Sequence, residues 1–149
     1  MQDFINKLPL DIVFFHIIPY TYNLQNKTLL DDIVNYKEAK TLLSQLYYNF
    51  WISQEQQDEP EDKNWLINDI YAYANNDVAG MYGRIEQFYN IFKRNKFLQT
   101  NEQIDNYLLM LERKHVTSHI NIFLGLLTPK ERNDIIKEFP IRNGVIDIL

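Results

Sequence analysis

The sequence LPLDIVFFHIIPY occupies residues 8–20, and a longer periodic segment that ends in aromatic residues at 47–51 follows it. The first part is almost unbroken in apolar residues from Ile12 to Ile18, and Pro9 supplies a fixed φ near its start. This pattern predicts a helix over about 9–18, which Pro19 ends. A helix that is apolar around most of its circumference must be covered by protein. Either the rest of the chain or a partner therefore has to bury this stretch.

Helical spacing of apolar residues continues through most of the chain, and strand signals are almost absent. Thr128, Pro129 and Glu131 combine an N-cap, an N1 proline and an N3 glutamate, which is the strongest helix start here. Further helices are predicted from an N-cap at Thr28, over about 60–75 and 78–92, from Thr100, and from 129 to a stop before Pro140. Two breaks stay open, one near Tyr36 and one near 117–118. We predict an all-α fold, a compact multi-helix bundle or an orthogonal array of six to eight helices.

An acidic segment at 55–63 marks the clearest candidate boundary, because it clusters carboxylates around Pro60 and contains no apolar residue. It predicts an N-terminal helical segment over 1–54, a linker over 55–63 and a C-terminal helical bundle over 64–149. The alternative is that 1–54 packs with the bundle as one domain. A second alternative is that the acidic segment contacts a basic partner.

The bulk composition excludes several classes of function. The chain has 149 residues, of which 46% are hydrophobic, so it can bury a core. It contains no cysteine, which excludes disulfides and thiolate metal sites. Fifteen Lys and Arg against twenty Asp and Glu give a net charge of −5, which argues against nucleic-acid binding. The apolar runs are too short for a membrane span, and we expect neither a secretory leader nor a membrane contact.

Motifs that carry chemistry are missing from the sequence. There is no phosphate-binding loop, dinucleotide fingerprint or nucleophile elbow, so we expect no enzyme activity and no cofactor. Glu112, His115 and His119 would share one side of a continuous helix and could then bind zinc. The competing interpretation gives both histidines structural hydrogen bonds, and we expect no metal. Gly80 and Gly83 have a GxxG spacing that is more typical of close helix approach than of RNA binding.

Aromatic residues make up 14% of the chain, and Tyr47, Tyr48, Phe50 and Trp51 gather near the end of the opening stretch. Nucleic-acid stacking platforms interleave such rings with cations, which are missing here. We therefore interpret this group as core residues or as anchors of a protein interface.

The order Leu-Pro, acidic residue and aliphatic pair at residues 8–13, with a second aliphatic pair at Ile17-Ile18 before Tyr20, resembles the start of an F-box. It is similar to the F-box-like N-termini of short proteins from large A/T-rich DNA viruses. The sequence departs from that motif at Pro19, where a serine is usual. The resemblance covers about a third of the chain.

The resemblance implies a non-enzymatic interaction module that docks onto the Skp-type adaptor of a cullin ubiquitin ligase. The part after Lys63 would then hold the target, in the cytoplasm or nucleus of an infected host cell. The side chains that would fill the adaptor's groove are those of Leu8, Pro9, Ile12, Val13, Ile17 and Ile18. Two alternatives stay open: these residues pack onto helices within 64–139, or the chain is a small structural or oligomerising viral protein with no ubiquitin link. A homo-oligomer is compatible with either.

Overall fold

The computed structural model describes residues 9–17, 26–54 and 61–144, and within these ranges the protein is all-α, without strands. The chain divides into two compact units, Met1–Ile33 and Val34–Leu149, which are described separately. Its α-helices in the described ranges are α2 (Leu10–Ile12), α4 (Lys27–Tyr47), α5 (Asp62–Ala74), α6 (Glu86–Phe92), α7 (Asn101–Leu111), α8 (Val116–Leu126) and α9 (Pro129–Arg142). The multi-helix fold predicted from the sequence is therefore confirmed.

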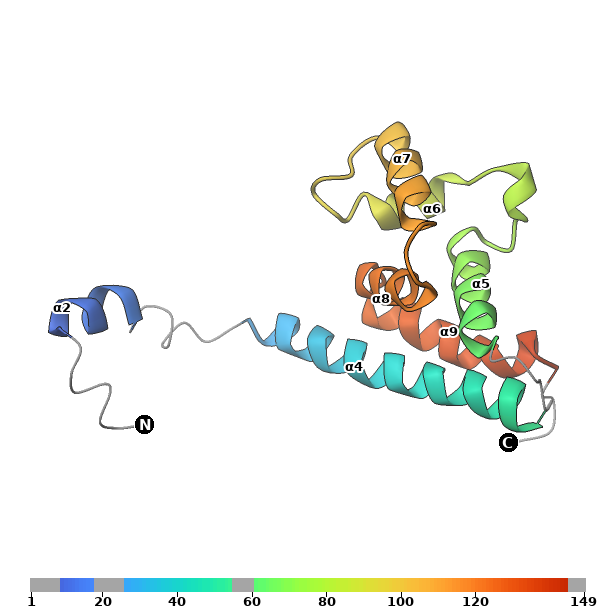
Figure 1. Cartoon of the computed structure of the whole chain (residues 1–149), viewed down its shortest axis with the longest axis horizontal. Helices are drawn as coiled ribbons and strands as arrows, with labels where there is room; N and C mark the ends of the chain where they lie inside the picture. The colour runs from blue at the N-terminus through green and yellow to red at the C-terminus, as the bar shows by residue number, and fades with distance from the viewer. Residues whose placement is uncertain (1–8, 18–25, 55–60, 145–149) are drawn as a thin grey trace. The chain divides into compact units, whose positions relative to one another are not determined.

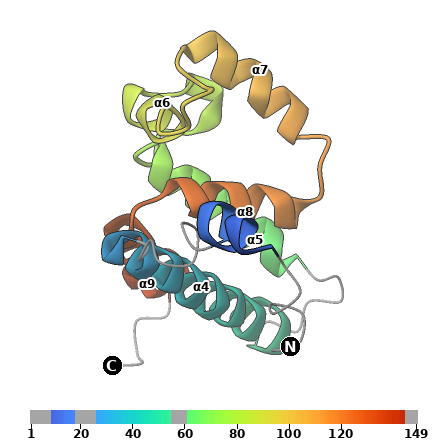
Figure 2. The same ribbon diagram turned by 90° about the vertical axis from the view of Figure 1, so that its left-hand side faces the viewer.

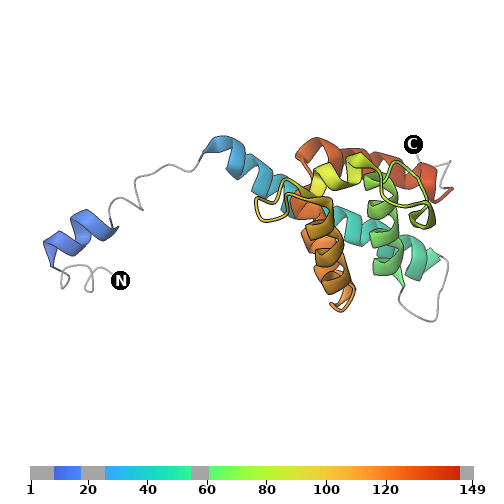
Figure 3. The same cartoon turned by 90° about the horizontal axis from the view of Figure 1, so that it is seen from above.

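The described part of the N-terminal unit contains the single α-helical turn α2, which widens into the π-helical segment η1 (Val13–Ile17), drawn in dark blue in Figures 1 and 3. Pro9 is the N-cap residue, and its carbonyl accepts a hydrogen bond from the Val13 N–H at 3.2 Å. The prediction of a helix after Pro9 thus holds for 10–17, and the predicted stop at Pro19 lies outside the described residues.

Helix α4 runs unbroken from Lys27 to Tyr47 and continues as the π-helical segment η2 (Tyr48–Gln54), so no break occurs near Tyr36 (Figure 1). The predicted cap at Thr28 is wrong, since the Asn26 Oδ1 accepts a hydrogen bond from the Thr28 N–H at 2.9 Å. Asparagine is a strong N-cap, and α4 therefore starts two residues earlier in the chain than predicted.

The division between the units falls inside α4, between Ile33 and Val34, whereas the sequence analysis placed a boundary at 55–63. The second half of α4 belongs to the C-terminal unit because Leu43 and Tyr47 are fully buried in its core. Of the acidic segment, residues 55–60 lie outside the described residues. Asp62 is buried and begins α5.

In the C-terminal unit, α6 and α7 lie at one end and α4 and α9 at the other, with α5 and α8 between them (Figures 1 and 2). Helix α5 contacts α8 most extensively, and it also packs against α6, α9 and η2. Among the helices that the structure describes, none combines the length and apolarity needed to cross a bilayer.

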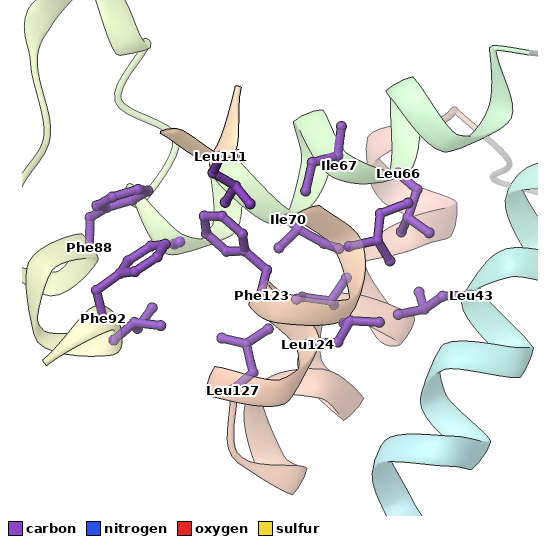
Figure 4. Close-up of a cluster of buried hydrophobic side chains, with 14 of the residues drawn as sticks. Leu43, Leu66, Ile67, Ile70, Phe88, Phe92, Leu111, Phe123, Leu124 and Leu127 are labelled. Carbon is purple, nitrogen blue, oxygen red and sulfur yellow. The ribbon is translucent and has the colours of Figure 1, made fainter. Parts of the chain in front are cut away.

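The hydrophobic core of the C-terminal unit is centred on α5 and α8. Phe123 of α8 packs edge-on against Phe92 of α6 at a centroid distance of 4.8 Å, and Ile70 of α5 lies on its other side (Figure 4). Each such fully buried side chain contributes about 1.5–3 kcal/mol relative to exposure. The buried residues that form this core are Leu43, Tyr47, Leu66, Ile67, Ile70, Ala74, Phe88, Ile91, Phe92, Leu98, Ile104, Leu108, Leu111, Ile120, Phe123, Leu124, Leu127, Ile135 and Phe139.

Two predicted capping boxes are confirmed. Thr100 and Gln103 exchange side-chain and backbone hydrogen bonds at the start of α7, and Thr128 and Glu131 do so at the start of α9. The predicted stop before Pro140 is wrong, because α9 continues to Arg142. Pro140 lies inside α9, where it cannot donate the N–H of an i→i−4 hydrogen bond. Arg142 pairs with Glu138 one turn back at 2.7 Å.

The predicted helix over 78–92 is only half correct. Residues 75–85 form a loop with one 3₁₀ turn, η3 (Gly80–Tyr82), and α6 begins at Glu86. The amide of buried Asn75 holds the loop: its Nδ2 donates to the carbonyls of Val78 and Gly83 at 2.6 and 3.0 Å, and its Oδ1 accepts from the Ile85 N–H at 2.9 Å. This local competition with helical hydrogen bonds overrides the apolar spacing.

The glycines of this loop do not serve a close helix contact, contrary to the prediction. A Cβ added at Gly80 or Gly83 would meet no heavy atom within 4 Å. Gly83 is needed for its φ of 93°, a conformation that residues with a Cβ rarely adopt. Met81, which lies on this loop, is 84% exposed.

Two arginines join helix ends in the C-terminal unit. Arg94, just after α6, donates to the Leu126 carbonyl at 2.9 Å and to both carboxylate oxygens of Glu131 at 2.5 and 2.7 Å. Arg132 is fully buried, and its Nε donates to the Leu124 carbonyl at 2.7 Å. Both therefore satisfy carbonyls in the last turn of α8, which α8 itself leaves without partners.

We expect Asn75→Ala to lower the free energy of unfolding by about 2–3 kcal/mol, because three hydrogen bonds inside the unit are lost together. Chemical denaturation measures the loss, and amide exchange of Ile85 should accelerate. Asn64→Ala, on the exposed face of α5, is the matched control and should change stability by less than about 0.5 kcal/mol. Equal effects of the two variants would contradict the bridging role of Asn75.

Burial alone would raise the pKa of Glu131, but hydrogen bonds from Arg94 and Thr128 outweigh it and lower that pKa to about 2. A carboxylate with a depressed pKa stabilises the fold above its unfolded-state pKa and loses this contribution as the pH falls from about 4.5 towards 2. We expect Glu131→Gln to cost about 0.5–1 kcal/mol at pH 7 and to flatten the pH dependence of stability in that window. Glu102→Gln, in the exposed first turn of α7, is the matched control and should change the free energy of unfolding at pH 7 by less than about 0.5 kcal/mol.

Candidate partner-binding surface

Three of the six residues predicted to contact a partner have described side chains, and none of the three is buried. Pro9 is exposed, Ile12 is 39% exposed and Val13 is half-buried. Leu8 and Ile18 lie outside the described residues. The backbone of Ile17 closes η1, but its side chain also lies outside what the structure describes.

Other apolar residues of the N-terminal unit are more exposed than the predicted contacts. Leu10 and Phe15 are 72% and 75% exposed, and Leu29, Leu30 and Ile33 on the first turns of α4 are each about half exposed. No described side chain of Met1–Ile33 is buried. Large exposed apolar residues that recur over a short segment are typical of surfaces that bind another molecule.

The C-terminal unit does not need these side chains for its own core, which is formed by residues from Tyr36 onward. A unit as small as Met1–Ile33 buries too little apolar surface to be stable by itself. The chain therefore contains one unit with a core and one short unit that has no buried residue in its described part.

The aromatic group at 47–51 divides between core and surface. The hydroxyl of fully buried Tyr47 donates to Asp69 at 2.5 Å, and burial together with this hydrogen bond raises the pKa of Tyr47. Trp51 stacks on Trp65 at 4.3 Å with an interplanar angle of 7°. Tyr48 is half exposed.

The three residues weighed as a zinc site do not share a helix. Helix α7 ends at Leu111, Glu112 caps it, and α8 begins after His115, whose Nδ1 accepts a hydrogen bond from the Thr117 N–H at 3.2 Å. The Nε2 of His119 donates to the Leu111 carbonyl at 2.5 Å. Because the helix breaks here, the spacing that zinc would need is lost. In the described ranges no three acidic, histidine or cysteine side chains are placed to hold a metal ion.

A shallow groove of about 580 Å³ runs between α4 and α9. Val34, Leu42 and Ile136 form its apolar part, and Lys37, Glu38 and Asn133 are among the polar residues that border it. It was not predicted from the sequence, because the groove exists only where α4 lies beside α9.

Comparisons with protein-family models, with curated proteins and with solved structures found no match to this chain. The assignment of a function therefore depends on the residues themselves and on the resemblance of the N-terminal sequence.

We expect His115→Ala to lower the free energy of unfolding by about 1 kcal/mol, because α8 loses its N-cap acceptor. Added zinc should leave the melting temperature of both the wild type and this variant unchanged. Thr117→Val keeps the backbone N–H that His115 accepts from and removes only the hydroxyl contact to the His115 Nδ1 at 3.1 Å, so it should cost less than His115→Ala. A zinc-dependent rise of the wild-type melting temperature that His115→Ala abolishes would contradict the capping role.

Proposed function

We propose that the chain is a non-enzymatic helical protein-interaction module whose N-terminal unit docks onto a protein partner. The observation that carries this proposal is the exposure of Leu10, Ile12 and Phe15 in a unit that has no buried residue in its described part. Burial of apolar area is the main favourable term in protein association, and these side chains supply it.

The partner that the resemblance favours is the Skp-type adaptor of a cullin ubiquitin ligase. An F-box-like segment contributes apolar side chains to an adaptor groove and carries out no chemistry. The C-terminal unit, which has its own core, would then present a target. In this proposal Leu8, Pro9, Ile12, Val13, Ile17 and Ile18 are the contact residues.

The proposal is tested with the purified full chain and a purified Skp-type adaptor by isothermal titration calorimetry. We expect binding by the wild type and at least a tenfold loss, about 1.4 kcal/mol, for the double variant Ile12→Asp, Ile17→Asp. Ile141→Asp is the matched control, because Ile141 is a 78% exposed isoleucine of the C-terminal unit. Thermal unfolding of the C-terminal unit should be the same in all three proteins.

Two outcomes would overturn this proposal. One is failure of the wild type to bind the adaptor, and the other is equal affinity of the wild type and the double variant. The alternative, a structural or oligomerising protein, makes a different prediction. Sedimentation velocity would then show a concentration-dependent oligomer, and the same double variant would dissociate it.

A further inference from the structure

A cavity of about 440 Å³ lies in the C-terminal unit where α5, the loop 75–85 and α6 meet. Tyr71, Asn75, Val78, Gly80, Arg84 and Phe88 are among its lining residues. At the roughly 30 Å³ that one molecule occupies in liquid water, it holds about fifteen non-hydrogen atoms. This is within the size range of cavities that bind small molecules.

The wall of the cavity is preformed. The three hydrogen bonds of Asn75 fix both arms of the loop, and Asn75 is 5% exposed. Asn76 and Asp77 have positive φ values of 49° and 59°, a left-handed conformation that asparagine and aspartate adopt more readily than other residues with a side chain. The Asp77 N–H donates to the Ala72 carbonyl at 2.8 Å, which holds this turn against the end of α5. A ligand would therefore not have to order this loop on binding.

The cavity combines an apolar wall with two polar side chains that are available to a ligand. Tyr71, Ala72, Val78 and Phe88 provide the apolar surface. Within the described chain, neither the amide of Asn68 nor the hydroxyl of Tyr71 has a side-chain hydrogen bond. The amide offers both a donor and an acceptor, and the hydroxyl offers the same.

Both charged residues of the cavity already have partners of opposite charge. The Arg84 guanidinium donates to Asp105 at 3.0 Å and lies 5.6 Å from the centre of the Phe88 ring. Asp77 pairs with Arg142 at 2.6 Å. A charged ligand would have to compete with one of these pairs, whereas a neutral ligand leaves both intact. The charges thus favour a neutral ligand.

We propose that this cavity binds a neutral, planar aromatic small molecule that carries an amide-like edge. The ring lies on the apolar wall, and the edge exchanges hydrogen bonds with Asn68 and Tyr71. This binding site is independent of the docking surface on the N-terminal unit, since all its lining residues belong to Val34–Leu149.

The test uses three probes of equal size that differ in charge: benzamide, benzoate and benzamidine. Each is titrated into the isotopically labelled full chain, and backbone amide shifts are followed by NMR at pH 7. We expect benzamide to shift the signals of Asn68, Tyr71 and Gly80 with a millimolar Kd, and both charged probes to bind at least fivefold more weakly. Tighter binding of either charged probe, or no shift at these residues with benzamide, would overturn the proposal.

Two pairs of variants locate the site. Gly80→Leu places a side chain at the cavity wall, and a Cβ at this position meets no heavy atom within 4 Å. Gly125→Leu has the same freedom on α8 and does not line the cavity. We expect Gly80→Leu to weaken benzamide binding at least tenfold and Gly125→Leu to leave it unchanged.

The second pair tests the polar edge. Asn68→Ala should weaken benzamide binding about fivefold, and Asn64→Ala, one turn earlier on α5, should have no effect. Equal affinities within either pair would show that benzamide binds elsewhere and would contradict the proposal. The proposed partner docking would be untouched by this result, because its variants and its readout are different.

Discussion

Phe123 of α8 is fully buried among aromatic rings of two other helices, with centroid distances of 4.8 Å to Phe92 and 4.5 Å to Tyr71. This contact joins α5, α6 and α8, and the remaining helices of the C-terminal unit pack around it. Ring pairs at such distances contribute about 0.5–1.5 kcal/mol beyond the area they bury. The positions of α6 and of the loop before it therefore depend on how the Phe123 ring of α8 packs against Tyr71 of α5.

Polar side chains complete this packing where helices end. Asn75, Arg94 and Arg132 each satisfy backbone groups that the neighbouring helices cannot, and two of the three are buried. A buried amide or guanidinium is tolerated only when its hydrogen bonds are made. Substitutions that remove the hydrogen-bond partners of Asn75 or Arg132 should therefore destabilise the unit. The same requirement shapes the loop 75–85, whose conformation creates the cavity beside Tyr71.

The two units differ in their packing, because all residues of the hydrophobic core belong to the C-terminal unit. The C-terminal unit forms its core from residues Tyr36 onward, and the described apolar residues of α2 and of the start of α4 are not part of it. The proposed docking segment and the proposed small-molecule cavity then lie in different units. A ligand in the cavity and a partner on the N-terminal unit would be recognised through separate sets of residues.

The sequence by itself determined the all-α class and the helix starts at Thr100 and Thr128, because these depend on local spacing and local hydrogen bonds. It could not determine that 75–85 is a loop, since the spacing of Val78, Met81 and Ile85 is helical and only the bonds of Asn75 overrule it. Nor could it show that Arg132 is buried or that α9 passes through Pro140. Those properties depend on contacts between residues far apart in the chain, and only the tertiary structure decides them.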